Sequence, residues 1–590
     1  MILTQTTAKG GITAAIAVAL FFCAGYGARY LSLNGDQVWV FQRLVGFVLV
    51  ILLVVFTFGR SVSDWASRSL NTSDKWILGH SARAAVLLAV LMGAYFVSWC
   101  GVSFLRHYYF HSSYDLGIMD QVVWNTAQGN FFARSIEVAN DLGDHVRLYL
   151  AALSSLYLVI PSPYVLLTFQ SLVLALSALP LYILARRKFD SPAIGLAVAC
   201  CALAYPPLGF LNRYDFHSEV LSIPLLIAAY ERIDVADLKS ASVLMALTLF
   251  TKENLGLTLA MLGIMAGLYK KHWRFGLTWA FVGIAYSLIA LLVVIPAFRG
   301  EPSDTLARYQ WLGNRPSQMV WGFLSQPVFV VGRILAGEHV LTLLQLFAPL
   351  AFLPLLGLPA LLPAVPTLIY NFLAEWPSQT VIYQHYMVPV IPFVLIAAVL
   401  GLHRLVTSPW VARFLNIPPA GGLRSNRPAG LGVSLMLAGI LTSWIYENPV
   451  TANASLVWSA SPEIVPMGQK TPVPMIWSNN SSIRDGLAHV PKDLAVLTTT
   501  NYAPHLTHRA WIEMIPRAPV STLRPEAELI FLNLRDLRFW NCEDYFETLR
   551  TAERLNFGVT YYRDDVVVVQ KNRGNIKKLE DLLGSWRGCK

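Results

Sequence analysis

Charged residues are scarce in this sequence. Asp, Glu, Lys and Arg make up 14% of its 590 residues, whereas a soluble globular protein carries about 25%. Hydrophobic residues make up 55%, and they gather in runs that approach or exceed the roughly 18–20 residues that cross a bilayer. Because lipid offers no partner to backbone polar groups, each run is expected to be a helix. The composition excludes an ordinary soluble protein and predicts a mainly α, polytopic membrane protein.

Three common catalytic motifs are also missing. The sequence has no GxxxxGK, no HExxH and no GxSxG, so nothing in it supports ATP use or hydrolysis by a metalloprotease or serine centre. It has no compact basic domain, and much of its net charge of +10 lies in short loops between apolar runs, which argues against nucleic-acid binding. The six cysteines show no metal-ligand spacing. Cys542 and Cys589 are able to pair if the C-terminal region is exported, which the sequence does not decide.

About thirteen apolar stretches are predicted to be membrane spans. They cover residues 11–31, 37–58, 82–104, 163–185, 192–210, 218–231, 239–251, 255–269, 274–298, 339–356, 358–374, 385–406 and 430–449. The first run is too long for the core of a signal peptide and has no clear small-residue cleavage site, so we expect it to be retained. Residues 1–81 are then two peripheral helices, 82–450 a transmembrane core with outer-face loops, and 451–590 a soluble domain.

Basic loops predict the orientation of these spans. Positive residues gather in three loops: Arg186, Arg187 and Lys188; Lys270, Lys271 and Arg274; and Arg404, Arg413, Arg424 and Arg427. Placing all three loops on the cytoplasmic side lets the spans alternate, with the N-terminus inside and the C-terminus outside. The apolar segment 147–160 would break this alternation, and as a helix it covers only about 21 Å, so we expect it to be interfacial. The unusual polar residues then gather on the outer face.

After about Val450 the composition becomes that of a soluble domain. The predicted elements are strands over 494–500 and 528–534, a hairpin that turns at 563–565, and an amphipathic helix over 544–555. A polar loop, 501–509, follows the first strand and either closes over the membrane face or lies on the surface. We expect a small extracytoplasmic α/β domain.

One stretch outside the third span combines acidic and apolar residues. It covers residues 114–129, YDLGIMDQVVWNTAQG, and carries Asp115 and Asp120 on a predicted short helix. Its apolar residues leave few positions free to face water, and Asp120, Trp124 and Gln128 form a polar stripe at i, i+4 and i+8. A partly desolvated carboxylate has a raised pKa and can act as a general base toward a hydroxyl. Capping or solvation of a surface helix is the alternative interpretation.

A second polar segment joins two predicted spans at 213–219, RYDFHSE. Asp215, His217 and Glu219 alternate along it, so an extended loop presents all three to one side. Three titratable groups in so short a loop exceed what helix capping needs, which favours a functional role. The alternative is a turn in which Asp215 or Ser218 caps the next helix and Arg213 pairs with an acid.

A third segment, TKEN at 251–254, interrupts an apolar stretch. Charges at membrane depth are costly and are functional by default. Lys252 and Glu253 are adjacent, so on a helix they point about 100° apart and each needs a different partner. A lysine here is suited to a phosphate oxygen, and a plain interfacial turn is the alternative. On the same predicted face, His145 is a metal ligand, a proton carrier or an interface residue, and His385 opens a later span.

These motifs resemble those of a family of bacterial and archaeal multi-pass membrane proteins. The motifs are the 114–129 stretch, Asp144-His145, the interfacial helix, ARRKF at 185–189, NRYDFHSEV at 212–220 and TKEN at 251–254. The resemblance covers roughly residues 85–400 and continues weakly into the C-terminal domain. That family is similar in layout to the type-C glycosyltransferases, so the resemblance implies a GT-C-like bundle.

The resemblance also implies an activity. It is an inverting transfer of a sugar from a polyprenyl-phosphate donor to a glycan, lipid or protein acceptor on the outer face of the cytoplasmic membrane. Asp115, which lies fourteen residues before Gly129, matches the position of the catalytic base, and Asp120 is the second choice. Many relatives have two adjacent acids here, whereas Leu116 follows Asp115 in this chain.

The donor side of the implied site is formed by further polar residues. They are Lys252, Arg213, His217, Glu219 and Glu253, with His145 and His385 as additional candidates. A Mg²⁺ or Mn²⁺ ion held by Asp115, Asp215 and His217 is compatible with their ligand atoms but is not required by the sequence.

A lipid-linked saccharide transporter or a non-catalytic membrane scaffold is the alternative to an enzyme. A transporter should place charged residues in the middle of its spans, along a path through the membrane. Here the charges gather at one predicted face, which favours chemistry at the surface.

Overall fold

The computed structural model describes residues 65–80, 82–300, 304–408, 427–446, 476–515, 527–536 and 542–585. Within these ranges four helical segments are long and apolar enough to cross a membrane: Arg83–Tyr108, Pro163–Phe189, Trp273–Arg299 and Leu353–Leu373. Two bent pairs of helices raise the number to six if each pair is one span. The predicted spans 11–31 and 37–58, like Cys589, lie outside the described residues, so the count of thirteen stays a prediction.

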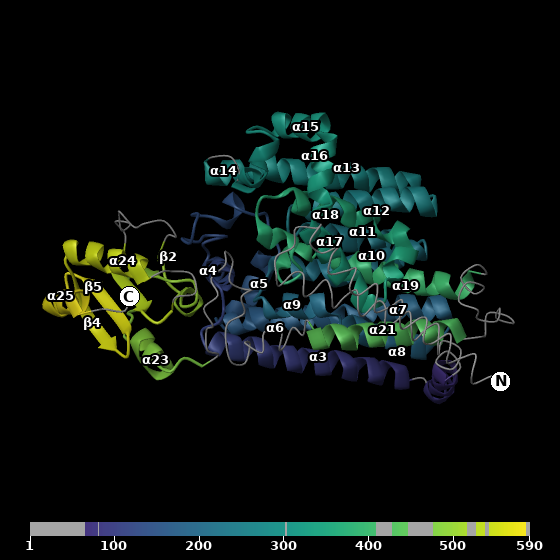
Figure 1. Ribbon diagram of the computed structural model, residues 1–590, viewed down its shortest axis with the longest axis horizontal. Helices are drawn as coiled ribbons and strands as arrows, with labels where there is room; N and C mark the ends of the chain where they lie inside the picture. The colour runs from purple at the N-terminus through teal and green to yellow at the C-terminus, as the bar shows by residue number, and fades with distance from the viewer. Residues whose placement is uncertain are drawn as a thin grey trace, which may run out of the picture.

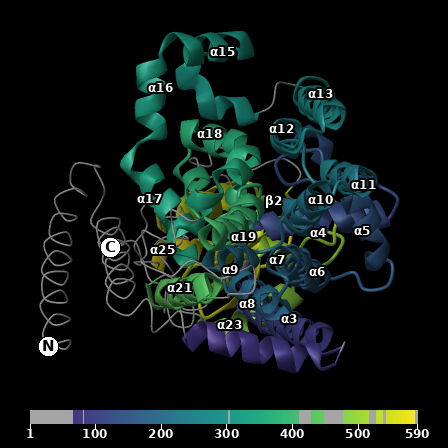
Figure 2. The ribbon, with the colours of Figure 1, turned by 90° about the vertical axis from the view of Figure 1, so that its right-hand side faces the viewer.

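Helices joined by short loops make up the described part of the bundle. They are α3 Arg83–Tyr108, α4 Tyr114–Ala127, α5 Leu150–Tyr157, α6 Pro163–Leu176, α7 Ala178–Phe189, α8 Pro192–Leu203, α9 Pro206–Arg213, α10 Ser222–Asp234, α11 Leu238–Leu249, α12 Leu255–Lys270, α13 Trp273–Ile289, α14 Ile295–Arg299, α15 Pro316–Ser325, α16 Pro327–Ile334, α17 Gly337–Phe347, α18 Val365–Leu373, α19 Ile391–Thr407 and α21 Arg427–Tyr446. Proline occupies the first turn of α6, α8 and α9, where its fixed φ favours helix initiation. Many of the long helices run side by side and are seen nearly end-on in Figure 2.

Small residues set how closely α12 and α13 approach. Gly256 and Gly263 of α12 face Gly283 and Gly276 of α13, and a Cβ on Gly283 would clash with the carbonyl oxygen of Gly256. Close backbone contact through small residues is typical of helix pairs in membranes, where apolar burial alone gives no driving force for association.

The three loops predicted to be cytoplasmic lie at the same end of the bundle. Arg187, Lys188 and Lys270 all reach the carboxylate of Asp234, at 2.5, 2.8 and 2.5 Å. The ring of His403, from the third loop region, lies 5.7 Å from that of Phe189. The shared end agrees with the expectation that these loops occupy one side of a membrane.

The C-terminal region forms an α/β unit beyond one end of the bundle, at the left of Figure 1. Its elements are β1 Val496–Thr498, β2 Ile512–Met514, β3 Leu529–Asn533, β4 Phe557–Arg563 and β5 Val566–Lys571, with helices α23 Asn480–Ala488, α24 Cys542–Arg554 and α25 Ile576–Ser585. The strand order is β2-β1-β3-β5-β4, parallel across β2, β1 and β3 and antiparallel at β5 and β4. The predicted strands, hairpin and helix are confirmed, and β2 was not predicted.

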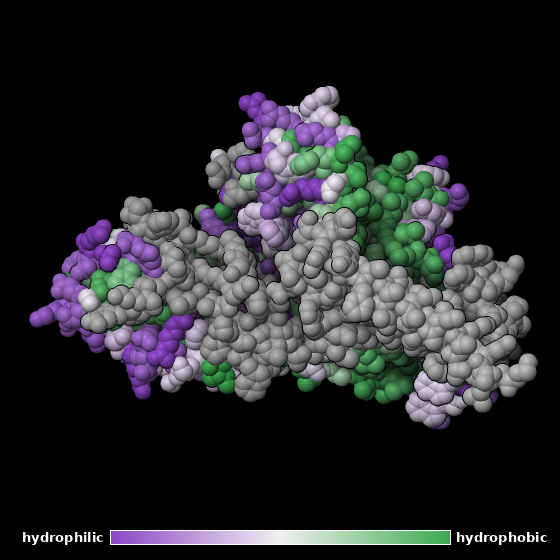
Figure 3. All heavy atoms as spheres, viewed as in Figure 1, coloured by the Kyte–Doolittle hydropathy of each residue, from purple (hydrophilic) through white to green (hydrophobic). Residues whose placement is uncertain are grey.

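Helix α4 lies between the bundle and this α/β unit. Its residues Leu116, Met119 and Val123 share one hydrophobic core with Tyr502 and Leu506 of the C-terminal region. The loop 501–509 therefore packs against α4 and does not lie free on the surface. In the space-filling view the described parts of the bundle show hydrophobic flanks, whereas the C-terminal unit is largely hydrophilic (Figure 3).

Candidate functional site

Asp115 lies in the first turn of α4, where the helix dipole favours a negative charge. Its Oδ2 atom accepts hydrogen bonds from the hydroxyls of Ser113 at 3.3 Å and Tyr214 at 3.4 Å. The same atom lies 3.8 Å from Nε2 of His217. The Asp115 side chain keeps 20% of its surface exposed.

The 214–219 loop is held against α4 by Gln170 of α6. The Gln170 side-chain amide donates to the carbonyl oxygen of Asp215 at 2.5 Å and accepts from the backbone N–H of His217 at 3.0 Å. Asp215 has a φ of 78°, a left-handed conformation that is uncommon outside glycine. Its Oδ2 atom accepts from the backbone N–H of Ser113 at 2.6 Å, which ties this loop to the start of α4. The first and second predicted polar segments therefore meet.

The third predicted segment joins them through Glu219. Nζ of Lys252 donates to Oε1 of Glu219 at 3.0 Å, and Nε2 of His385 lies 3.7 Å from the same oxygen. The hydroxyl of Ser218 donates to the other Glu219 oxygen at 3.1 Å. These side chains are almost fully buried, so the charge of Lys252 is neutralised by a close acid.

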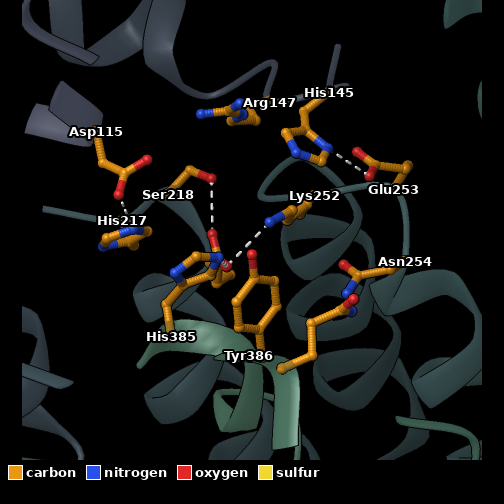
Figure 4. A network of polar contacts seen from close by, with 12 residues as sticks. Asp115, His145, Arg147, His217, Ser218, Lys252, Glu253, Asn254, His385 and Tyr386 are labelled. Carbon is orange, nitrogen blue, oxygen red and sulfur yellow. Dashed lines mark hydrogen bonds and ion pairs between the residues drawn. The ribbon is translucent and has the colours of Figure 1, made fainter. Parts of the chain in front are cut away.

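Two stacked imidazoles connect the acid to the lysine. The rings of His217 and His385 are parallel, with centroids 4.0 Å apart. His217 faces Asp115 and His385 faces Glu219, so the order across the site is Asp115, His217, His385, Glu219 and Lys252. These five residues are called the Asp115 cluster. Figure 4 shows Asp115 and His217 on one side, Lys252 on the other and His385 with Tyr386 below.

Lys252 and Glu253 have different partners, as the helix geometry predicted. Glu253 accepts from Nδ1 of His145 at 2.8 Å and from the backbone N–H of Val146 at 2.9 Å. Burial raises the pKa of Glu253, but His145 and Lys252 outweigh it and leave the pKa lowered. This pair fixes the 251–254 break against the loop that precedes α5.

The pKa of Asp115 differs from the expectation of a raised value. Burial acts to raise it, but the hydrogen bond and charge of His217, with Arg147 and Ser113, outweigh burial and leave the pKa below its ordinary value. Asp215 behaves in the opposite way, because burial dominates its partners and raises its pKa. The sequence argument considered desolvation alone and left out the groups that stabilise the ionised carboxylate, which are His217, Arg147 and Ser113.

The structure separates Asp120 from this site. Asp120 is fully buried, and Oδ1 accepts from the hydroxyl of Tyr157 at 2.5 Å. Its other oxygen accepts from the hydroxyl of Thr507 and lies 3.0 Å from Nε2 of His508. The His508 ring stacks on Trp124 of α4 with centroids 5.4 Å apart. Asp120 therefore joins α4 to the C-terminal loop 501–509 and does not face the Asp115 cluster.

Arg147 acts electrostatically on Asp115 and was not singled out from the sequence. It is buried, and NH2 contacts Asp141 and Asp144 at 3.5 Å each. Asp144 is bound more closely by Arg134, at 2.7 Å. In Figure 4 Arg147 lies across from Lys252. Arg147 was overlooked because it begins an apolar segment that was interpreted only as an interfacial helix; the helix itself, α5, covers Leu150–Tyr157 and is too short to span.

Two other predicted roles have less geometric support. Arg213 is buried at the end of α9, directly before Tyr214. Among the described residues, no group of three or more His, Cys, Asp or Glu side chains is arranged to hold a metal ion. Asp115, Asp215 and His217 lie near one another but are not such a group, because the Asp215 carboxylate points to the backbone of Ser113.

Comparisons with solved structures give a loose similarity. Crystal structures of ArnT from Cupriavidus metallidurans, one bound to undecaprenyl phosphate and one in the apo state, match 83% of this chain and 98% of theirs. The TM-score is 0.44 in both cases, with 13% and 14% sequence identity, which is too low to transfer fold or activity. No curated protein matches the chain.

A family match covers most of the chain. Residues 106–568 match the family described as Predicted membrane protein (DUF2079). The matched region runs from the end of α3 to β5, so it contains every segment of the Asp115 cluster. The chain belongs to the DUF2079 family of predicted membrane proteins.

Proposed function

We propose that this protein is a membrane glycosyltransferase of the type-C class, which transfers a sugar from a polyprenyl-phosphate donor to an acceptor. The observation that carries this proposal is the meeting of Asp115 and Lys252 through His217, His385 and Glu219. These residues come from four segments far apart in sequence. This reaction needs a carboxylate that binds the acceptor hydroxyl and a cation that binds the donor phosphate, both at one place.

The orientation is part of the proposal. The loops that share Asp234 carry the basic residues expected on the cytoplasmic side. With that end inside, the N-terminus is cytoplasmic, and residues 451–590 are extracytoplasmic beside a bundle of about thirteen spans. The Asp115 cluster then lies at the outer face of the cytoplasmic membrane, where polyprenyl-phosphate sugars are accessible.

The proposed chemistry is an inverting displacement. Asp115 orients the acceptor hydroxyl and takes its proton as the oxygen attacks the anomeric carbon of the sugar. The bond between that carbon and the phosphate oxygen breaks, and polyprenyl phosphate leaves with the electron pair. Lys252 stabilises the charge that develops on the leaving oxygen. The depressed pKa of Asp115 keeps it ionised before the reaction, so its main contribution is to hold and polarise the hydroxyl.

An exposed apolar helix face supports a donor with a long apolar chain. Helix α13 exposes large apolar side chains along its length, among them Leu277, Phe281 and Leu288. Such a face is stable in lipid but not in water. The TKEN break that carries Lys252 directly precedes α12, which packs on α13, so the lysine lies close to a lipid-facing wall.

Transfer from a panel of radiolabelled polyprenyl-phosphate sugars tests the proposal. The purified protein in proteoliposomes should consume one donor and release polyprenyl phosphate when a suitable acceptor extract is added. The product should have the anomeric configuration opposite to that of the donor, as shown by NMR. Movement of intact donor across the bilayer without cleavage would support the transporter instead.

A further inference from the structure

Glu219 is held as if it were a bound anion. Lys252 donates to it at 3.0 Å, His385 lies 3.7 Å away, and Ser218 donates to its second oxygen at 3.1 Å. The side chains of Glu219 and Lys252 are only 5% and 9% exposed. A lysine, an imidazole and a hydroxyl around two oxygens are also the groups that bind a phosphate.

Arg147 is a second cation, and its contacts with neighbouring carboxylates are long. Its residue surface is only 3% exposed. NH2 meets two carboxylates at 3.5 Å, NH1 lies 3.0 Å from the sulfur of Met119, and Nε has no hydrogen-bond partner among the described residues. A buried guanidinium normally makes short, paired contacts. The Nε donor of Arg147 is therefore available to a further acceptor.

Arg147 and Lys252 lie around the same space. Figure 4 shows Arg147, Ser218 and Lys252 around one region, with Tyr386 rising into it from below. The carboxylate of Glu219 acts electrostatically on Arg147 as well as on Lys252. Lys252 makes a close contact with Glu219, whereas the carboxylates nearest to Arg147 are those of Asp141 and Asp144.

We infer that Glu219 is the resting occupant of a phosphate site, and that the phosphate of the donor displaces its carboxylate from Lys252 and binds between Lys252 and Arg147. This inference rests on the proposed function and adds Arg147 as a donor-binding residue. It also gives the site a resting state in which Lys252 is paired. Displacement breaks no covalent bond, because one anion replaces another on Lys252.

Binding of a short isoprenyl phosphate tests the inference. The purified full-length protein in detergent is titrated with farnesyl phosphate, with farnesol and with inorganic phosphate, and the dissociation constants are measured by calorimetry. The two other ligands distinguish recognition of a lipid phosphate from that of the isoprenyl chain or of free phosphate. The variants are Glu219→Gln, Glu219→Asp, Arg147→Gln and Lys252→Gln. Glu253→Gln is the matched control, because it removes a buried carboxylate next to Lys252 that does not contact it.

The inference predicts that Glu219→Gln binds farnesyl phosphate about tenfold more tightly than the unmodified chain, because the competing carboxylate no longer occupies the site. Glu219→Asp, which keeps the charge but shortens the side chain, should bind with intermediate affinity and serves if the glutamine variant does not fold. Arg147→Gln and Lys252→Gln should each bind about tenfold more weakly or worse. The affinity for farnesyl phosphate should increase less in Glu253→Gln than in Glu219→Gln.

Three results would overturn the inference. If the unmodified chain binds farnesyl phosphate but both Glu219 variants bind it equally or more weakly, Glu219 is not a competitor, and the proposed function stands without it. An unchanged affinity in Arg147→Gln removes Arg147 from the site. Absence of binding of any phosphate ligand by the unmodified chain refutes the proposed function together with the inference.

Discussion

Oδ2 of Asp115 lies 3.8 Å from Nε2 of His217, and this contact joins α4 to the loop that follows α9. It places the acid expected to act on the acceptor beside the loop expected to act on the donor. It also explains why the pKa of Asp115 is lowered although the side chain is largely buried.

Removing one member of the Lys252–Glu219 ion pair should destabilise the protein more than removing both. Lys252→Gln leaves a buried carboxylate without its cation, which should cost about 3–5 kcal/mol of stability. The double variant Lys252→Gln/Glu219→Gln should recover most of that loss, because no charge then remains uncompensated. Thermal unfolding in detergent measures both. A double variant that is less stable than the single one would show that Glu219 has another essential partner.

Asp120 should anchor the C-terminal loop. Asp120→Asn keeps the size of the side chain but weakens its contacts with Thr507 and His508, at a cost of about 1–3 kcal/mol. Hydrogen exchange of the backbone amides in 501–509 should become faster. Asp564→Asn is the control, since Asp564 accepts from Ser482 within the α/β unit and does not contact α4. Equal acceleration in both variants would contradict a specific anchor at Asp120.

Asp144 should make stability depend on pH in the acidic range. Burial opposes its ionised form, but His145, Arg134 and Arg147 outweigh burial and lower its pKa. A depressed pKa contributes stability above the pKa of the unfolded state, about 4, and that stability is lost as the pH falls. The difference in melting temperature between the unmodified chain and Asp144→Asn should therefore stay the same from pH 8 to 5. Below about pH 4 this difference should shrink as the pH falls. A difference that widens on acidification would contradict this sign.

Gly283 should be required for the approach of α13 to α12. A methyl group there would clash with the carbonyl of Gly256, so Gly283→Ala should destabilise the protein by about 1–3 kcal/mol. Gly93 of α3 is the matched control, because a Cβ at that position meets no atom within 4 Å. Gly93→Ala should be neutral or slightly stabilising, since alanine favours a helix. A loss of equal size at both positions would contradict the close packing.

The sequence predicted local structure better than it predicted partners. Apolar runs indicated the helices, and alternating residues indicated the strands around β1, β3, β4 and β5, because both patterns depend on neighbours in the chain. β2 was missed, since it has only three residues and includes the polar Glu513. The role of Asp120 was also hidden, because Thr507 lies 387 residues away and only packing brings the two together.

Prediction of the candidate site from the sequence was limited in the same way. The polar segments around Asp115, Asp215 and Lys252 were recognisable because charge is rare beside apolar runs. Arg147 was not, because one arginine at the edge of an apolar run is also a normal interfacial residue. The direction of the Asp115 pKa depended on His217, a partner that one sequence does not assign.

Transfer by the Asp115→Asn and Asp120→Asn variants tests the central claim most directly. Both substitutions replace an acid on α4 with an amide of the same size. Only Asp115 lies beside His217, in the cluster that also contains Lys252. With the donor that the unmodified protein uses, Asp115→Asn should lower the turnover rate by about 10²-fold or more, whereas Asp120→Asn should retain most of it. Full activity in Asp115→Asn, with its folding confirmed, would contradict the assignment of this site.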